Sequence, residues 1–296
     1  MMLFICLHLS IHMQVSSYDV TILFEWGNRM NIKLVIADLD NTLALTGEPM
    51  PELNKQALRA LHERGIRFCL ASGKNLYILK QIEKSWNLDF EQAFVIGMNG
   101  SELLNRVRNR TYEYETLSAD TIREIYDLMS PFKLNPFVYW NDGILIKEYD
   151  DELEASCKRN HLEKYYFKDI GPLWQKENAK VLYRMNEELV PSVREYLEKH
   201  KSDKWTLVQT QKTMLEFVHP ETSKGHTLQR ICEMENIPLD EVMAFGDSEN
   251  DDEMLKICHG ICLKNGMESS KRLSEAVTDL DCEEGGFGDY LFKNLL

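Results

Sequence analysis

The sequence carries two acidic stretches that decide its expected fold, Asp38-Leu39-Asp40-Asn41-Thr42 and Gly246-Asp247-Ser248-Glu249-Asn250-Asp251. Each follows a short apolar run, at residues 33–37 and 242–245, that is typical of a strand buried in a parallel sheet. Open α/β folds bind ligands at the carboxyl ends of such strands, so both stretches are predicted to meet at one edge. Carboxylates gathered there raise one another's pKa values unless a cation lies among them. The sequence therefore predicts a metal site.

The composition is that of an ordinary soluble globular protein of 296 residues, with 44% hydrophobic and 28% charged residues. The formal net charge of -14 argues against nucleic acid or an anionic membrane as a main partner, since both bind basic surfaces. A small anionic substrate stays compatible, because local charge decides a site. The seven cysteines form no regular framework, which favours reduced thiols and a cytoplasmic location.

Strands and helices alternate on both sides of a middle region that has a different pattern. The alternation from residue 31 to about residue 100 indicates βαβ units and a parallel sheet. Hairpin signals such as Asp142-Gly143 give the middle region an α+β character, and the alternation returns after Pro220. We predict an α/β core interrupted by an inserted domain. The core is assigned to residues 30–104 and 214–296, and the inserted domain to residues 105–213.

Residues 1–29 precede the first predicted core strand and are expected to form an N-terminal extension. Their apolar stretch is broken by polar residues, so it makes a poor signal peptide and is too short for a membrane-spanning helix. Because Met30 stands just before the core, one hypothesis is that translation begins there; a disordered extension is the alternative. N-terminal mass spectrometry of the native protein distinguishes the two.

Asp38 and Asp40 lie two residues apart, so on an extended strand both side chains point to the same side. Two carboxylates in this arrangement suit a division of labour. One can attack as a nucleophile, as aspartate does in enzymes that form an aspartyl-phosphate, while the other transfers protons. A solvated turn is the alternative interpretation of this motif taken alone.

Four more residues fall on predicted strand-to-helix turns: Ser72, Lys224, Asp247 and Asp251. A hydroxyl that opens a helix, as at Ser72, suits a phosphoryl oxygen. A cation in the first turn of a helix, as at Lys224, indicates a nearby anion. Asp247 and Asp251 add carboxylate oxygens, which are the donors that Mg²⁺ prefers. Each residue alone also has an ordinary interpretation, as a helix cap or as a surface lysine.

Together and in this order, the fragments resemble the haloacid dehalogenase superfamily. The matching segments are residues 38–43 (DLDNTL), 71–74 (ASGK), 223–225 (SKG) and 246–255 (GDSENDDEML). The long insertion resembles the cap of the Cof-type phosphatases, a subfamily that acts mostly on sugar phosphates and similar metabolites. The resemblance implies a Rossmann-like doubly wound parallel sheet core with an inserted α+β cap domain.

The resemblance also implies a role for each matching residue. Asp38 would attack phosphorus, and Asp40 would protonate the leaving alcohol and then activate water. Asp38, Asp247 and the backbone carbonyl of Asp40 would bind Mg²⁺. Asp251 would be a further ligand or would support one. The substrate-binding residues would be Thr42, Ser72, Gly73, Asn99, Gly100, Lys224 and Asn250.

The sequence therefore predicts a magnesium-dependent phosphomonoester hydrolase that acts on a small phosphorylated metabolite, a sugar phosphate by resemblance, through an aspartyl-phosphate. The alternatives are a phosphotransferase or phosphomutase with the same intermediate, and a non-catalytic metabolite sensor on the same fold. Two positions depart from the family pattern. Asn41 stands where Gly is most frequent, and Lys74 stands where Arg is common. Both flank the predicted chemistry, so they bear on substrate fit more than on activity.

Overall fold

The computed structural model describes residues 12–15, 18–21 and 31–296, and the chain divides into two units, residues 1–31 and 32–296. In the first unit, β1 (His12–Val15) and β2 (Tyr18–Thr21) pair antiparallel. The rest of the predicted N-terminal extension, and Met30 after it, lie outside the described residues. Within the described part of the chain, no helix has the length and apolar character needed to cross a membrane.

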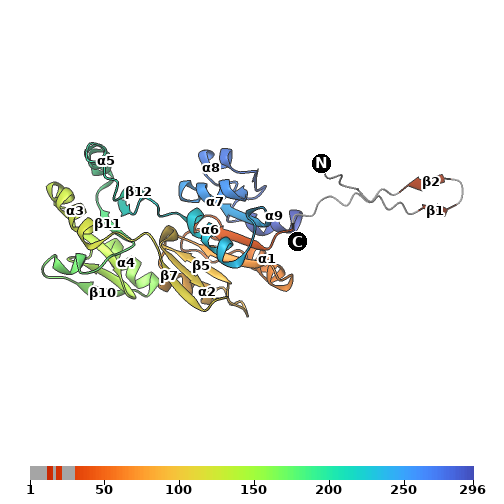
Figure 1. Ribbon diagram of the computed structural model, residues 1–296, viewed down its shortest axis with the longest axis horizontal. Coiled ribbons are helices and arrows are strands. Elements are labelled where there is room, and N and C mark those ends of the chain that lie inside the picture. Colours follow the sequence, from red (N-terminus) through yellow and green to blue (C-terminus); the bar gives the residue numbers. More distant parts are fainter. Residues whose placement is uncertain (1–11, 16–17, 22–30) are drawn as a thin grey trace. The chain divides into compact units, whose positions relative to one another are not determined.

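The second unit is built around an eight-stranded sheet with the order β16-β15-β14-β3-β4-β5-β6-β7 (Figure 1). The strands are β3 (Leu34–Asp38), β4 (Arg67–Ala71), β5 (Phe94–Gly97), β6 (Glu102–Asn105), β7 (Arg110–Glu113), β14 (Val242–Gly246), β15 (His259–Cys262) and β16 (Ala276–Val277). All pairs from β16 to β5 are parallel, and β6 and β7 add an antiparallel hairpin. Because β3 and β14 are parallel neighbours, both acidic stretches leave the sheet at the same edge.

Helices cover both faces of this core sheet. Alternate residues of β3 pack into two different apolar clusters, Val35 and Ala37 in one, Leu34 and Ile36 in the other. A strand that is apolar on both sides is buried between two helical layers. The first layer includes α1 (Glu52–Glu63), α2 (Leu76–Ser85) and α9 (Gly286–Asn294), and the second includes α6 (Lys224–Glu235) and α7 (Asp252–Ile257). One further core helix is α8 (Glu268–Leu273).

A six-stranded sheet with the order β10-β9-β8-β11-β13-β12 forms a second lobe, which we call the cap. Its strands are β8 (Pro136–Trp140), β9 (Gly143–Ile146), β10 (Glu163–Tyr166), β11 (Lys180–Arg184), β12 (Thr206–Gln211) and β13 (Met214–Val218). One face packs against α3 (Ala119–Met129) and α5 (Val190–Glu198), and the other packs against α4 (Asp151–Asn160). Short 3₁₀ helices are η1 (Met98–Gly100), η2 (Ser130–Phe132), η3 (Gly171–Trp174), η4 (Glu187–Leu189), η5 (Leu239–Glu241) and η6 (Glu249–Asp251).

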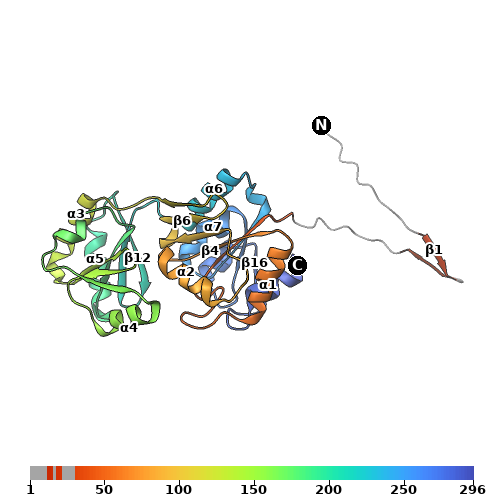
Figure 2. The ribbon, with the colours of Figure 1, turned by 90° about the horizontal axis from the view of Figure 1, so that it is seen from below.

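Two connections join the core to the cap, and sheet membership locates them (Figure 2). The first runs from β7 to α3, because β7 extends the core sheet by pairing with β6. The second runs from β13 to α6, because β13 pairs with β11 and β12 in the cap sheet. The predicted limit at residue 105 therefore falls at the end of β6, inside the core hairpin, and the predicted limit at residue 214 falls at the start of β13, inside the cap sheet. We propose residues 114–118 and 219–223 as the limits of the inserted domain.

The cap contacts the core through α2. Ile78 of α2 belongs to the same apolar cluster as Phe137, Ile144 and Leu182 of the cap. The Tyr77 hydroxyl donates a hydrogen bond of 3.3 Å to the His161 carbonyl. The face of the cap sheet that carries Leu182 is therefore covered partly by a helix of the core.

Candidate active site

Lys224 joins two buried carboxylates at the edge of the core sheet. Its Nζ lies 2.5 Å from Asp38 Oδ1 and 2.6 Å from Asp251 Oδ1. Asp38 ends β3 and Asp251 follows β14, while the Ser223 side chain caps α6 and makes Lys224 its first residue. The Lys224 and Asp251 side chains are fully buried, and that of Asp38 is 8% exposed. With so little water in contact, these charges must compensate one another.

Burial dominates the electrostatics of this cluster. Desolvation raises the pKa of Asp38 well above its ordinary value, with Lys224 opposing the rise and the neighbouring carboxylates adding to it. Desolvation also works against the charge on Lys224, but Asp251 and Asp38 outweigh it and leave the pKa of that ammonium raised. Lys224 therefore stays charged, whereas Asp38 is short of positive charge around it.

Asp247 supplies a third carboxylate to the same place. One carboxylate oxygen from each of Asp38, Asp247 and Asp251 lies within 4.8 Å of the other two. Burial, together with the nearby charge of Asp251, raises the pKa of Asp247 to about 7, and Lys224 and the Thr42 hydroxyl oppose the rise. Three carboxylates facing one ammonium leave an excess of negative charge on hard oxygen donors. This arrangement fits a divalent cation.

Asp251 is held by the protein on both carboxylate oxygens. Its Oδ1 accepts from Lys224, and its Oδ2 accepts from the backbone N–H groups of Asp247 (3.0 Å) and Ser248 (3.2 Å). The contact with Ser248 is half of a capping box that starts η6. Asp251 therefore fixes the loop that carries Asp247. Of its two predicted roles, these contacts favour support of a metal ligand.

Asp40 lies beyond the buried cluster and pairs with Lys74. Lys74 Nζ donates to Asp40 Oδ2, and both side chains are about a quarter exposed. The chain turns directly after Asp40 because Asn41 adopts φ of 63°, and the Asn265 side chain donates to the Asn41 carbonyl at 2.8 Å. Sequence reasoning missed this role of Lys74. Its position two residues after Ser72, at the same sheet edge, was the available signal.

The loops after β4, β5 and β14 bring together four of the predicted substrate-binding residues, Ser72, Gly73, Asn99 and Asn250. Asp38 pairs in register with Ala71, so Ser72 emerges beside Asp38 at the sheet edge. The backbone N–H of Asn99 donates to the Ser72 carbonyl at 3.0 Å, and Asn99 Oδ1 accepts from Asn250 at 3.1 Å. A Cβ on Gly73 would lie 3.2 Å from Asn99 Oδ1, so this loop packs closely against Asn99.

The other two predicted substrate-binding residues, Thr42 and Gly100, make internal contacts. Thr42 is fully buried, and its hydroxyl donates to Asp247 Oδ1 at 3.2 Å. The Gly100 carbonyl accepts from the Thr227 hydroxyl at 2.7 Å, at the first turn of α6. Thr42 therefore orients a carboxylate, and Gly100 helps to place the helix that begins with Lys224.

Replacing Gly100 by Ala is expected to lower the free energy of unfolding by at least about 2 kcal/mol, measured by urea denaturation. Gly100 has φ of +120°, and a Cβ there would clash with the Ser223 carbonyl oxygen. The matched control is Gly47→Ala, where φ is +85° but, apart from the two adjoining residues, no described atom lies within 4 Å of the added Cβ. That variant should lose only the backbone strain, about 1 kcal/mol. Equal losses would show that the contact with Ser223 carries no weight.

The pKa of Asp247 predicts how the metal-free protein responds to pH. A carboxyl whose folded pKa is raised from its ordinary value to about 7 contributes stability at low pH and loses it as pH rises through about 7. Added Mg²⁺ favours the carboxylate, so it should raise the thermal midpoint more at about pH 8 than at about pH 6. Thermal unfolding with Mg²⁺ or with EDTA tests this expectation. A pH-independent effect of Mg²⁺ would contradict it.

Thr42→Val sharpens the same test. Because the Thr42 hydroxyl lowers the pKa of Asp247, its loss should raise that pKa and leave more of the carboxyl protonated at neutral pH. Mg²⁺ must then displace a proton, so calorimetry should show weaker Mg²⁺ binding to the variant than to wild type. The difference in Mg²⁺ affinity should become smaller as pH rises. Thr206→Val, at an exposed position of β12, is the control. It should bind Mg²⁺ as wild type does.

Comparison with known proteins identifies the family to which this chain belongs. Residues 35–291 match the model of the haloacid dehalogenase-like hydrolases. A crystal structure of a haloacid dehalogenase-like hydrolase from Bacteroides thetaiotaomicron has a TM-score of 0.79 at 23% identity and covers 88% of this chain and 99% of its own. This likeness confirms the predicted fold class.

Two curated relatives extend the comparison. The 5-amino-6-(5-phospho-D-ribitylamino)uracil phosphatase YcsE of Bacillus subtilis is 24% identical, over 86% of this chain and 93% of its own length. A chloroplastic endoribonuclease YBEY of Arabidopsis thaliana is 27% identical over 88% of this chain, but the chain spans only 46% of that protein. The phosphatase name agrees with the predicted enzyme class. The family that the motifs predicted is confirmed, and the chain belongs to the haloacid dehalogenase-like hydrolases.

Proposed function

We propose that this chain is a magnesium-dependent phosphatase that hydrolyses a phosphomonoester of a small metabolite through an aspartyl-phosphate on Asp38. The observation that carries the proposal is the cluster of Asp38, Lys224, Asp247 and Asp251 at the end of β3. It combines a carboxylate able to attack, a fixed cation and a set of oxygen donors. That combination suits the transfer of a negatively charged phosphoryl group.

The chain's own residues account for both halves of the reaction. Asp38 forms a bond to phosphorus while the bond to the leaving oxygen breaks, and Asp40 gives that oxygen a proton. Asp40 then takes a proton from water as the water attacks the aspartyl-phosphate, which releases phosphate and restores the Asp38 carboxylate. Lys224 compensates charge beside Asp38 throughout, and the Ser72 hydroxyl donates to a phosphoryl oxygen.

Mg²⁺ would be held by Asp38, Asp247 and the backbone carbonyl of Asp40, and when bound it would neutralise charge on the phosphoryl oxygens. Asp251 supports this set from behind through its contacts with Lys224 and the Asp247 backbone. The excess of carboxylates over ammonium groups in the buried cluster supports the assignment.

For the substrate we propose a sugar phosphate or a related phosphorylated polyol. The printed name of the Bacillus subtilis relative describes a phosphoribityl compound, which belongs to this class. The cap lies against α2 and so borders the loop that carries Ser72. Free thiols at all six cysteines of the described residues support a reducing, cytoplasmic location.

The experiment measures phosphate release from a panel of sugar, nucleotide and cofactor phosphates, with Mg²⁺ or with EDTA. We expect release that needs Mg²⁺ and is fastest for a sugar phosphate. Addition of a sugar acceptor should not convert the product from phosphate to a new phosphate ester. Failure of folded, Mg²⁺-loaded protein to release phosphate from every compound would overturn the proposal.

A further inference from the structure

Lys180 is a buried lysine of the cap whose ammonium contacts the core. It begins β11 and is 3% exposed. Its Nζ donates to Glu216 Oε2 at 2.8 Å within the cap, and to the Gly73 carbonyl oxygen at 3.0 Å in the core. A buried lysine is costly unless it is paired and hydrogen-bonded, so its position requires both contacts.

The cap sheet explains why Lys180 points toward the core. Leu182 pairs in register with Glu216 on antiparallel β13, so Lys180 and Glu216 are diagonal neighbours on the same face. That face also carries Leu182, which packs in one cluster with Ile78 of α2. The Tyr139 ring, whose centroid lies 5.5 Å from Lys180 Nζ, adds a cation–π contact. Seating of the cap on α2 therefore brings Lys180 to the loop that precedes α2.

The Gly73 carbonyl belongs to a peptide unit that reaches Ser72. In a trans peptide, the carbonyl oxygen of Gly73 and the N–H of Lys74 point in opposite directions within one plane. Lys180 holds the oxygen, and the Lys74 N–H donates to Ser72 Oγ at 3.2 Å. With its oxygen accepting this bond, the Ser72 hydroxyl keeps its own hydrogen to donate to another acceptor.

We infer that Lys180 is a positioning residue for phosphoryl binding. Through the peptide between Gly73 and Lys74 it aims the Ser72 hydroxyl at the phosphoryl group, and it does so only while the cap is seated on α2. The cap therefore contributes to the phosphoryl site. This inference rests on the proposed phosphatase function.

A double-mutant cycle tests it, with p-nitrophenyl phosphate as the probe and saturating Mg²⁺. Lys180→Met should lower kcat/KM by about 10- to 100-fold, the range typical of removing an outer partner that orients a ligating group. In the Ser72→Ala background, the same substitution should change kcat/KM by no more than about twofold, because the group it orients is gone. Additive losses would overturn the inference.

The leaving group provides a second readout. Because Lys180 acts on the phosphoryl group, its loss should reduce kcat/KM by the same factor for p-nitrophenyl phosphate and for the best sugar phosphate of the panel. A loss confined to the sugar phosphate would place Lys180 at the leaving group and would overturn the inference.

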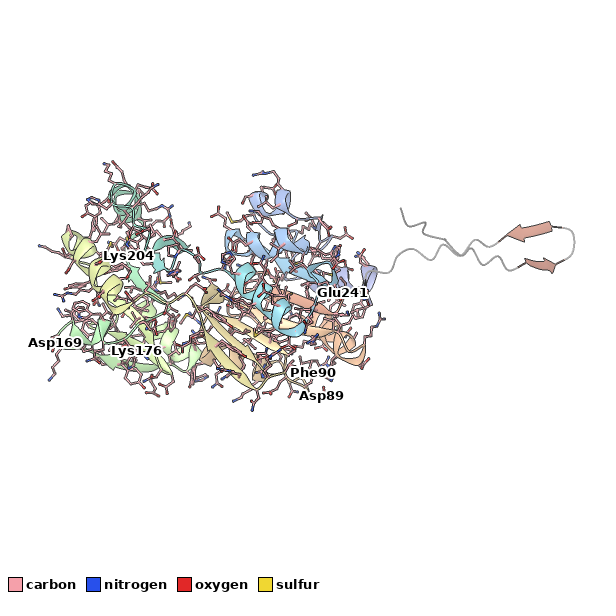
Figure 3. All side chains as sticks on the ribbon, viewed as in Figure 1. Asp89, Phe90, Asp169, Lys176, Lys204 and Glu241 are labelled. Carbon is pink, nitrogen blue, oxygen red and sulfur yellow. The ribbon has the colours of Figure 1, made fainter. Side chains whose placement is uncertain are left out.

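Two variants separate positioning from damage to the fold. Lys180→Met combined with Glu216→Leu removes the pair without leaving a buried charge, and it should show the same loss with normal unfolding. Recovery of wild-type kcat/KM in that variant would overturn the inference. Lys204→Met is the control, because Lys204 pairs with Glu124 at an exposed place on the cap and should leave activity unchanged (Figure 3). An inactive wild type would instead overturn the proposed function, and the inference with it.

Discussion

Replacement of Asp38 by Asn is expected to lower kcat by about 10⁴-fold or more, because an amide cannot attack phosphorus. Asn has the shape of Asp, and its oxygen can still accept from Lys224, so the variant should stay folded. Burial already raises the pKa of Asp38, which means that the neutral form of this side chain suits its surroundings. The measurement is steady-state phosphate release from the best substrate of the panel with saturating Mg²⁺.

The control for Asp38→Asn is Asp89→Asn, which makes the same change of charge in the exposed loop after α2 (Figure 3). It should keep wild-type kcat. Trapping of ³²P on the wild type but not on Asp38→Asn, after rapid acid quenching, would locate the covalent intermediate. If Asp38→Asn retained more than about 1% of wild-type kcat, Asp38 would not be the nucleophile.

The edge of the core sheet could be predicted from the sequence because its signals are local. The apolar runs before Asp38 and Asp247 each mark a strand buried on both faces, and parallel strands must end at a common edge. The position of Lys224 in the first turn of α6 already called for an anion, and Asp38 and Asp251 lie there. Residue type and position within an element were enough in each case.

The direction of a side chain at that edge could not be predicted in the same way. Thr42 follows Asp40 closely and is predicted to bind substrate; after the turn at Asn41, with φ of 63°, its hydroxyl donates to Asp247 Oδ1. The residues at which a strand ends can be predicted from local sequence, whereas the direction of a side chain in the following turn depends on the conformation of the whole loop.

Contacts within the cap, and between the cap and the core, could not be predicted from the sequence either. A lysine in a strand ordinarily faces solvent, but Lys180 is buried on the face of the cap sheet that α2 of the core helps to cover. The pairing of β13 with β11 places Glu216 beside it. No local pattern reports a pair formed by residues 36 positions apart on neighbouring strands.

Replacement of Lys224 by Met should both abolish turnover and destabilise the protein. Removing one partner from a buried ion pair typically costs about 3–5 kcal/mol, because the remaining charge is left without compensation. Here two carboxylates, Asp38 and Asp251, would lose the same ammonium. Urea denaturation of the metal-free proteins measures the loss. Lys204→Met, which breaks an exposed pair with Glu124, is the matched control and should change stability little.

The destabilisation of Lys224→Met should grow with pH. Lys224 lowers the pKa values of Asp38 and Asp247, so its removal moves both further above their ordinary value of 3.8. A raised carboxyl pKa contributes stability at low pH that is lost as pH rises through the folded value. The difference in free energy of unfolding between wild type and Lys224→Met should therefore be smaller at about pH 5 than at about pH 8. Mg²⁺ should reduce this difference at the higher pH, because it supplies positive charge to the same carboxylates. If the difference in free energy of unfolding depended on neither pH nor Mg²⁺, Lys224 would stabilise the core by packing. Another group would then have to compensate the charge of Asp38 in the proposed reaction.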